Sequence, residues 1–259
     1  MTRSEQKKNR RVRREEQSLM KVAGLPAVAA LFAKAPERVE RLFFTTETKQ
    51  AAGAFCTEMA KARKPYRLVT PEELTKVAGT PMHGNIVAVA KPREVLPFEP
   101  AQAKEWAKDG KPLLILDGIS NPHNLGAIAR TAAFFGIPRM VLSDHPAQAG
   151  VSDASYRVAE GGLDCIDLYK AKNFTAALKK LREFYHVIAA APGDHVQLTK
   201  LKPAAKPFAL VLGNEEHGMP EVNMKACDRI VAIPGEGQIQ SLNVSASAAI
   251  LIYAITQKG

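Results

Sequence analysis

The chain has 259 residues, of which 46% are hydrophobic and 24% charged, which suits a soluble protein with one large or two small domains. No apolar run approaches the roughly 18 residues of a membrane span, and the N-terminus lacks the apolar core of a secretory signal. Three widely spaced cysteines, Cys56, Cys165 and Cys227, favour reduced thiols in a cytoplasm over a disulfide framework.

The formal net charge is +10, and residues 1–21 supply +5 of it through eight basic and three acidic residues. Almost no apolar residue precedes Leu19, so residues 1–18 are predicted to form a basic flexible arm. Such an arm suits a polyanion, because each neutralised phosphate releases counterions. A merely solubilising tail is the alternative, and charge by itself does not decide between them.

Residues 19–92 have the pattern of a small α/β unit. Thr70 is expected to cap a helix that has Pro71 at its first position and acidic residues in its first turn. The elements expected in this unit are helices over 25–35, 49–64 and 70–79 and strands over 39–46, 65–70 and 84–90.

Residues 93–111 contain Pro97, Pro100 and a polar stretch, so they are predicted to be a linker with at most one helical turn. Trp106 is the single tryptophan of the chain. It either pins this segment down or covers part of the core.

Residues 112–259 alternate continuous apolar strands with helices, which predicts a mostly parallel sheet covered on both faces. Ser152 and Asn173 are expected to cap two of the helices. The elements expected here are strands over 112–119, 139–144, 165–169, 186–191, 208–213 and 229–235 and helices over 124–136, 152–162, 173–184 and 241–258.

Three loops of this region combine glycines with short polar side chains, and each follows a predicted strand. They are "DGISNPHNLGAIAR" after Leu116, "GNEEHG" after Leu212 and "IPGEGQIQSLNVS" around Ile233. Ligands of parallel sheets bind beyond the carboxyl ends of the strands, and glycines there let the backbone approach a ligand closely. We therefore expect these loops to form the site.

Arg130 is the only charged residue, histidine aside, between Gly118 and Pro138. An unpaired guanidinium in a packed helix is costly, so Arg130 must lie on an exposed edge, pair with a carboxylate or face a polar cleft. Glu215 and Glu216 are either that partner or the first turn of a solvated helix. Asn121 and Asn124 are either hydrogen-bonding residues of the site or simply turn and cap residues.

Two other kinds of site are disfavoured. His123 and His217 have no second ligand at zinc-binding spacing, so no metal is expected. The segment "GEGQIQ" lacks the third glycine of a dinucleotide-binding loop, and no phosphate-binding loop motif is present.

The last helix is apolar on nearly every side from Ala246 to Ile255. Such a helix needs burial on more than one side. A second subunit is one way to cover it, and a fully intramolecular position is the other.

Taken together, "NPHNLGAIAR", "LVLGNEEHG" and "IPGEGQIQSLNVSASAA" resemble the three motifs of the SpoU family, in the same order and with similar spacing. These are RNA ribose 2'-O methyltransferases of the SPOUT (α/β-knot) superfamily. Residues 20–90 resemble, more loosely, the small substrate-binding domain that precedes the methyltransferase domain in that family.

The resemblance implies S-adenosylmethionine as cofactor, RNA (ribosomal or transfer) as substrate, a homodimer formed through the last helix and a C-terminal trefoil knot, which general topology rules would argue against. It implies that the protein is an enzyme, and the reduced cysteines place that enzyme in the cytoplasm. The residues carried over are Gly213, Ile233 and Leu242 as cofactor-binding and Asn124, Arg130, Glu215, Ser241 and Asn243 as catalytic or supporting.

Gly235 departs from the family pattern, which usually has methionine after "IP" in the third motif. A bacterial branch of unsettled substrate shares this change, and the resemblance is closest to that branch. The change motivates an alternative function, an RNA-binding or assembly protein that keeps the fold without methyl transfer. The sequence leaves open whether Arg130 clamps a phosphate or accepts a proton.

Overall fold

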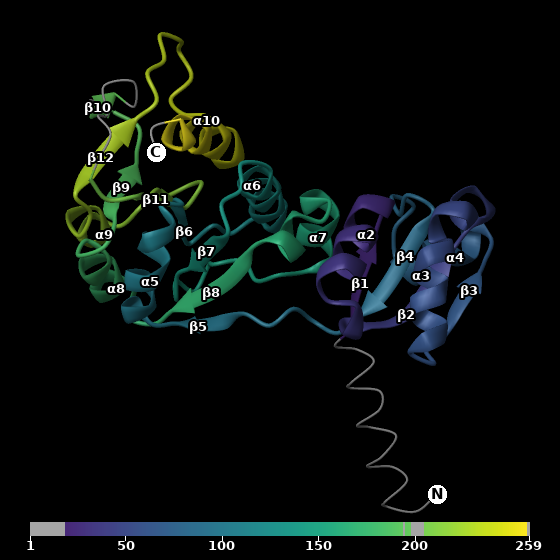
Figure 1. Ribbon diagram of the computed structural model, residues 1–259. Helices are drawn as coiled ribbons and strands as arrows, with labels where there is room; N and C mark the ends of the chain where they lie inside the picture. The colour runs from purple at the N-terminus through teal and green to yellow at the C-terminus, as the bar shows by residue number, and fades with distance from the viewer. Residues whose placement is uncertain (1–18, 194, 198–204, 258–259) are drawn as a thin grey trace, which may run out of the picture. The chain divides into compact units, whose positions relative to one another are not determined.

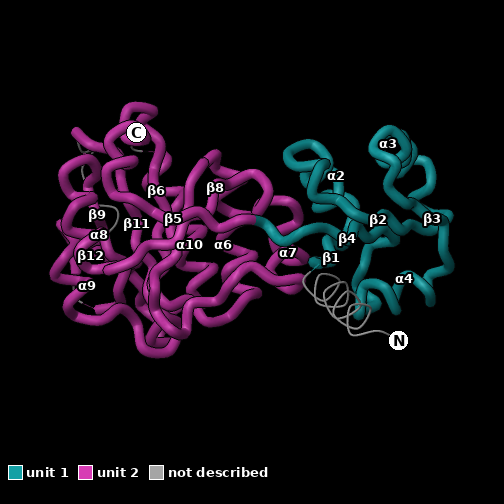
Figure 2. Tube along the Cα trace, turned by 90° about the horizontal axis from the view of Figure 1, so that it is seen from below, with its two compact units in different colours: residues 1–93 teal, residues 94–259 magenta. Residues whose placement is uncertain are grey.

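The computed structural model describes residues 19–193, 195–197 and 205–257 (Figure 1). The chain divides into two compact units, with the boundary between Arg93 and Glu94 (Figure 2). The basic arm predicted for residues 1–18 lies outside the described residues. No helix in the described ranges combines the length and the apolar character that crossing a membrane requires.

The first unit is built on a mixed sheet with the strand order β1-β4-β2-β3. β2 pairs with β3 in parallel, and β4 runs antiparallel to both β1 and β2. The short strand β1 was not predicted from the sequence. The elements are β1 (Met20–Ala23), α2 (Leu25–Lys34), β2 (Val39–Phe44), α3 (Lys49–Lys61), β3 (Tyr66–Leu68), α4 (Pro71–Ala78) and β4 (Ile86–Ala90).

The predicted cap of α4 is confirmed. The hydroxyl of Thr70 accepts a hydrogen bond from the backbone N–H of Glu73, and the Glu73 carboxylate accepts one from the N–H of Thr70. This reciprocal pair satisfies two of the donors that a helix start leaves unpaired. Gly79 ends the helix with a left-handed φ of 70°.

The second unit contains, in its described residues, an eight-stranded sheet with the order β10-β12-β9-β11-β6-β7-β8-β5. All the pairs between these strands are parallel, which confirms the predicted sheet type. The strands are β5 (Leu96–Phe98), β6 (Leu113–Asp117), β7 (Arg139–Leu142), β8 (Asp167–Ala171), β9 (His186–Ala190), β10 (Val196–Gln197), β11 (Phe208–Gly213) and β12 (Arg229–Ala232).

Helices cover both faces of this sheet (Figure 1). Ser152 caps α7 through a reciprocal pair with Ser155, as expected. Asn173 precedes α8 but adopts φ 51° and makes no capping bond through its side chain, so that prediction is wrong. The helices are α5 (Ala103–Trp106), α6 (Pro122–Phe134), α7 (Asp153–Ala159), α8 (Phe174–Leu181), α9 (Glu221–Lys225) and α10 (Val244–Thr256).

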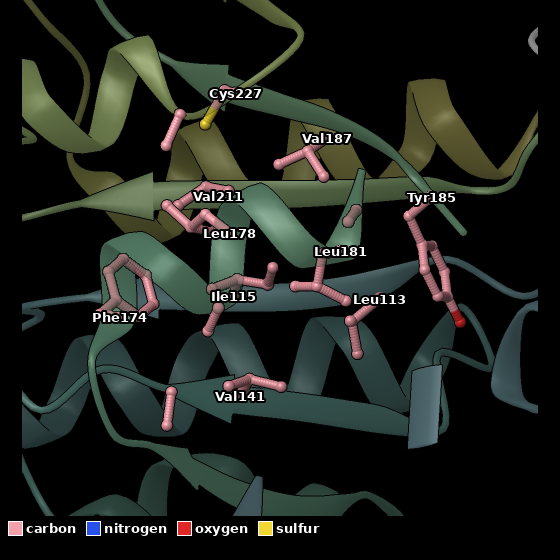
Figure 3. Packing of buried hydrophobic residues seen from close by; sticks show 14 of the residues in the cluster. Leu113, Ile115, Val141, Phe174, Leu178, Leu181, Tyr185, Val187, Val211 and Cys227 are labelled. Atoms are coloured by element: carbon pink, nitrogen blue, oxygen red, sulfur yellow. The ribbon is translucent and has the colours of Figure 1, made fainter. Parts of the chain in front are cut away.

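One hydrophobic core fills the space between the sheet and α8. Because side chains alternate along a strand, Leu113 and Ile115 of β6 point to the same face and meet Leu178 and Leu181 of α8 (Figure 3). Val211 of β11 joins the same cluster. This packing holds in place the strands that the site loops follow.

Close backbone packing joins α6 to α7 on the opposite face. A Cβ at Gly126 of α6 would collide with the carbonyl oxygen of Ser155 in α7. A Cβ at Gly162, after α7, would lie 2.8 Å from the Cα of Arg130. Only glycine allows these approaches, so the two glycines set the position of α7 and its following turn on α6.

The segment expected to be a linker is mostly an ordered part of the second unit. β5 pairs with β8, and Trp106 packs on Phe98 and Tyr169 with ring centroids 5.7 and 4.7 Å apart. The guanidinium of Arg139 lies 5.2 Å from the centre of the Trp106 ring. Trp106 therefore pins this segment to the sheet edge and also covers part of the hydrophobic core, so both roles that the sequence left open apply.

Candidate active site

Three loops follow the carboxyl ends of strands that lie close together in the sheet. The first leads from β6 into α6, the second follows β11, and the third leads from β12 into α10. β11 is the direct neighbour of β6, and β9 separates it from β12. The parallel arrangement thus brings polar segments distant in sequence to one edge of the sheet.

The carboxylate of Glu215 is at the centre of the hydrogen bonds that join the first two loops. One carboxylate oxygen, Oε2, accepts hydrogen bonds from the N–H and the hydroxyl of Ser120 at 3.0 and 3.1 Å. The other, Oε1, accepts from the side-chain amide of Asn124 at 2.9 Å and from the N–H of Asn121 at 3.3 Å. Glu215 therefore fixes the start of α6 onto the loop after β11.

The environment of Glu215 favours its ionised form. Burial alone would raise the pKa of the carboxyl, but the hydrogen bonds from Asn124, Ser120 and Asn121 outweigh it and lower the pKa below its ordinary value of 4.5. An ionised carboxylate only accepts hydrogen bonds, so every group around it must present a donor. The expectation that residues 215–216 begin a solvated helix is wrong. They lie in a turn closed by a bridge between Asn214 and Gly218.

Asn124 links this network to the third loop. Its side-chain oxygen accepts a hydrogen bond from the amide of Asn243 at 3.3 Å. The side-chain oxygen of Asn243 in turn accepts from the N–H and hydroxyl of Ser245 at 2.8 and 2.6 Å, which caps the start of α10. A continuous chain of side chains, from Glu215 through Asn124 to Asn243, joins all three loops.

Arg130 takes no part in this series of side-chain hydrogen bonds. Its guanidinium Nη2 lies 2.9 Å from a carboxylate oxygen of Glu160, at the end of α7. The hypothesis that Glu215 or Glu216 pairs with Arg130 is therefore wrong within one chain. Arg130 follows Asn124 by six positions, roughly one and two-thirds helical turns, so their side chains leave different faces of α6.

The remaining predicted residues flank the network. Gly213 ends β11, where a Cβ would lie 2.8 Å from the backbone nitrogen of Met219, so the tight turn requires glycine. Ile233 is half-buried just after β12, and Ser241 and Leu242 are exposed just before α10. These four residues and the network occupy the same three strand-end loops.

Several residues of the site were not predicted from the sequence. Gln148 accepts hydrogen bonds from the N–H groups of Gly118 and Ile119 at 2.9 and 3.2 Å, and Asn214 donates to the carbonyl of Gly118 at 2.7 Å. These contacts hold the first loop in shape. No spacing or motif marks Gln148, and Ser120 lies in the first predicted loop but was not singled out, because each acts through a partner far away in sequence.

The buried polar groups continue beyond the network. Asp117, the last residue of β6, is 2% exposed and accepts a 2.8 Å hydrogen bond from the side chain of Asn223. Gly118 follows it directly with φ 77°. The left-handed turn at Gly118 redirects the chain from the strand to the site.

Two family models match this chain. The description "SpoU rRNA Methylase family" covers residues 111–253, and "RNA 2'-O ribose methyltransferase substrate binding" covers residues 21–96. The first match spans more than half of the chain and contains the whole network described above.

The chain is similar to several known proteins along most of its length. It is 31% identical over 234 residues to the 23S rRNA (guanosine-2'-O-)-methyltransferase RlmB of Nitrosomonas europaea, with 90% of this chain and 89% of that protein covered. It is 32% identical over 242 residues to the uncharacterized tRNA/rRNA methyltransferase YfiF of Escherichia coli O157:H7, covering 93% and 69% of the two chains.

The fold is shared with a solved structure, that of the SpoU methyltransferase AviRb from Streptomyces viridochromogenes in complex with the cofactor AdoMet. The TM-score is 0.72 at 18% identity, with 93% of this chain and 90% of that chain covered. The matched family model, the identity to the relatives and the three strand-end loops agree. The chain belongs to the SpoU rRNA methylase family and carries that family's substrate-binding region ahead of the methylase region.

Proposed function

We propose that this protein transfers a methyl group from S-adenosylmethionine to a ribose 2'-hydroxyl of RNA, which leaves S-adenosylhomocysteine and releases the hydroxyl proton to solvent. The observation that carries the proposal is the hydrogen-bonded chain Glu215–Asn124–Asn243, which joins the three loops that resemble the family motifs. Relatives that match over about nine-tenths of this chain are named as methyltransferases of this kind.

The residues of the second and third loops fit S-adenosylmethionine. Gly213, Ile233 and Leu242 lie on loops at the ends of strands separated only by β9. Half-buried and exposed apolar side chains beside loop backbone suit a purine, which needs an apolar surface and backbone hydrogen bonds. Bound there, the cofactor supplies a methyl group that its sulfonium already activates. S-adenosylmethionine carries no phosphate, so its site needs no phosphate-binding loop.

We assign a separate role in the reaction to each of the other side chains. Arg130 holds the phosphate next to the reacting ribose and stabilises negative charge developing on the 2'-oxygen, because a guanidinium stays protonated and offers a fork of donors. Glu215 keeps Asn124 in place, and both of its oxygens are occupied by donors, so it orients rather than accepts the proton. Asn243 and Ser241 shape the loop before α10. Positioning of this kind supplies up to about 7–11 kcal/mol in well-oriented systems.

Ribosomal RNA is the proposed substrate, with a guanosine as the modified nucleotide. The relatives named RlmB act on guanosine of 23S rRNA, and the first unit matches the model of the substrate-binding region. The net charge of +10 favours a polyanionic partner. We place this reaction in the cytoplasm, in agreement with three free cysteines.

A homodimer formed through α10 and the end of α6 completes the proposal. α10 lies beside α6, and this surface exposes Phe134 at 82%, Tyr253 at 56% and Ile250 at 41%. Phe135 packs on both Phe134 and Tyr253, so the aromatic side chains form one cluster. Apolar patches of this kind mark protein interfaces. Arg130 stands one turn before Phe134 on the same helix face, so the dimer places it at the rim of the interface. The trefoil knot implied by the family stays a prediction.

The experiment measures transfer of labelled methyl from S-adenosylmethionine to ribosomal RNA isolated from cells that lack this protein, and maps 2'-O-methyl positions in the product. Wild-type protein should add 2'-O-methyl groups at one kind of position in this RNA. Arg130→Ala should abolish transfer while calorimetry still shows cofactor binding. Arg130→Ala turnover near the wild-type rate would overturn the role of Arg130.

Gly235 favours a second candidate, an RNA-binding protein that has lost methyl transfer. Wild-type protein that binds RNA but shows no heat of binding with S-adenosylmethionine would support this candidate and overturn the first. Restoring the usual family residue with Gly235→Met tests the cause, because it should then restore cofactor binding.

A further inference from the structure

We propose that Glu160 is a positioning residue that holds the Arg130 guanidinium in its working orientation. The proposal rests on the proposed function of Arg130 and deepens it. It stands on three observations: an ion pair, a backbone conformation that costs free energy, and a glycine contact that fixes one partner on the other's helix.

The ion pair joins the Nη2 atom of Arg130 to the Oε2 atom of Glu160 at 2.9 Å, with the two side chains 57% and 47% exposed. Exposed pairs of this kind contribute little to folding stability. A guanidinium has five N–H donors in a rigid fork. A contact through Nη2 restrains the fork and leaves its other donors for a phosphate.

The backbone at Glu160 is strained. It ends α7 in the left-handed region, with φ 44° and ψ 45°. A side chain with a Cβ is disfavoured there, and glycine is the residue that usually ends a helix in this way. Because an exposed ion pair returns little stability, stability alone would favour glycine at this position. Strained residues of this kind concentrate at functional sites.

The next residues anchor Glu160 to α6. Gly162 packs so closely that an added Cβ would lie 2.8 Å from the Cα of Arg130 and 3.0 Å from the carbonyl oxygen of Ala129. The turn that carries Glu160 is therefore pressed against the helix turn that carries Arg130. The backbone of Glu160 is thereby held beside the base of the arginine side chain, which is what a positioning residue needs.

The test uses Glu160→Gln, which keeps the side-chain shape without the charge, and Glu160→Gly, which also relaxes the left-handed backbone. Glu183→Gln is the matched control, because Glu183 forms a 2.7 Å exposed ion pair with Lys180 elsewhere in the same unit. The assay is methyl transfer to ribosomal RNA from cells lacking the protein.

Both Glu160 variants should lower kcat by roughly tenfold or more, because misplacement of a reacting group is costly. KM for RNA should not rise, since a negative charge near the RNA phosphates has been removed. Glu160→Gly should unfold at the same temperature as the wild type or a higher one. Wild-type kcat in both variants would overturn the proposal.

A second readout separates this proposal from the proposed function. Nitrogen-15 relaxation of the Arg130 side-chain Nε–H measures how restricted the guanidinium is, without any RNA. It should be ordered in the wild type and in Glu183→Gln and mobile in Glu160→Gln. If wild-type protein transfers no methyl group, the proposed function fails, and equal mobility in wild type and Glu160→Gln is then the result that overturns the positioning role.

Discussion

The side-chain amide of Asn124 donates a 2.9 Å hydrogen bond to the carboxylate of Glu215, although 91 residues separate them in the chain. The two residues follow β6 and β11, which are neighbours in the parallel sheet. The sheet order therefore creates the contact, and the four donors around Glu215 make it specific. The predictions below test this contact and the surfaces around it.

Replacing Glu215 with glutamine should destabilise the second unit and abolish methyl transfer. The amide presents donors to a place lined by donors, so part of the network stays unsatisfied at a cost of about 1–3 kcal/mol. Denaturant unfolding measures the change in the free energy of unfolding. Glu216→Gln is the control, because Glu216 is the exposed neighbour and undergoes the same loss of charge. Equal effects of the two variants would show that the network does not hold Glu215.

The network should also make stability depend on pH in one direction. The folded pKa of Glu215 lies below its ordinary value of 4.5, so its stabilising contribution is complete above that value and is lost as the pH falls through the lower, folded pKa. The difference in unfolding free energy between wild type and Glu215→Gln should be constant from neutral pH to about 5 and shrink below it. A difference that grows on acidification would contradict the lowered pKa.

Phe134→Glu should convert the proposed dimer into a monomer. Phe134 is 82% exposed in the aromatic cluster beside α10, and a charge in the centre of an apolar interface is costly to bury. Light scattering coupled to gel filtration gives the mass. Val222→Glu is the control, since Val222 of α9 is 57% exposed and lies outside that cluster. A wild-type protein that is already monomeric at micromolar concentration would exclude this interface.

Gly126→Ala should destabilise the fold by about 1–3 kcal/mol, because the new methyl group collides with the backbone of α7. Gly53→Ala makes the same chemical change in α3, where a Cβ meets nothing within 4 Å. This control should be neutral or stabilising by up to about 1 kcal/mol, since alanine favours helix more than glycine does. Thermal unfolding of the two variants compares them directly.

Local patterns in the sequence were enough to predict most of the elements. The cap at Thr70 was predicted because its partner, Glu73, is three residues away. The short elements β1, β5, β10 and α9 were missed. β1 and β5 are only four and three residues long and owe their extended shape to pairing with β4 and β8, which the local sequence does not reveal.

The residues of the candidate site were also only partly predictable from the sequence. Asn124, Glu215 and Asn243 were chosen from motifs, and the structure joins them. The partner of Arg130 was not predicted, because Glu160 lies on another element, 30 positions away, with no pattern connecting the two. Gln148 and Ser120 were missed for the same reason.

The sequence by itself therefore determined the alternation of strands and helices, the parallel sheet and the three loops beyond it, because hydrophobic periodicity and caps act over a few residues. Only the tertiary structure decided which loops meet, which carboxylate each donor finds and where glycine must admit a neighbouring backbone. Those contacts depend on the order of strands in the sheet and on the packing of α7 against α6, which join residues from 30 to about 120 positions apart.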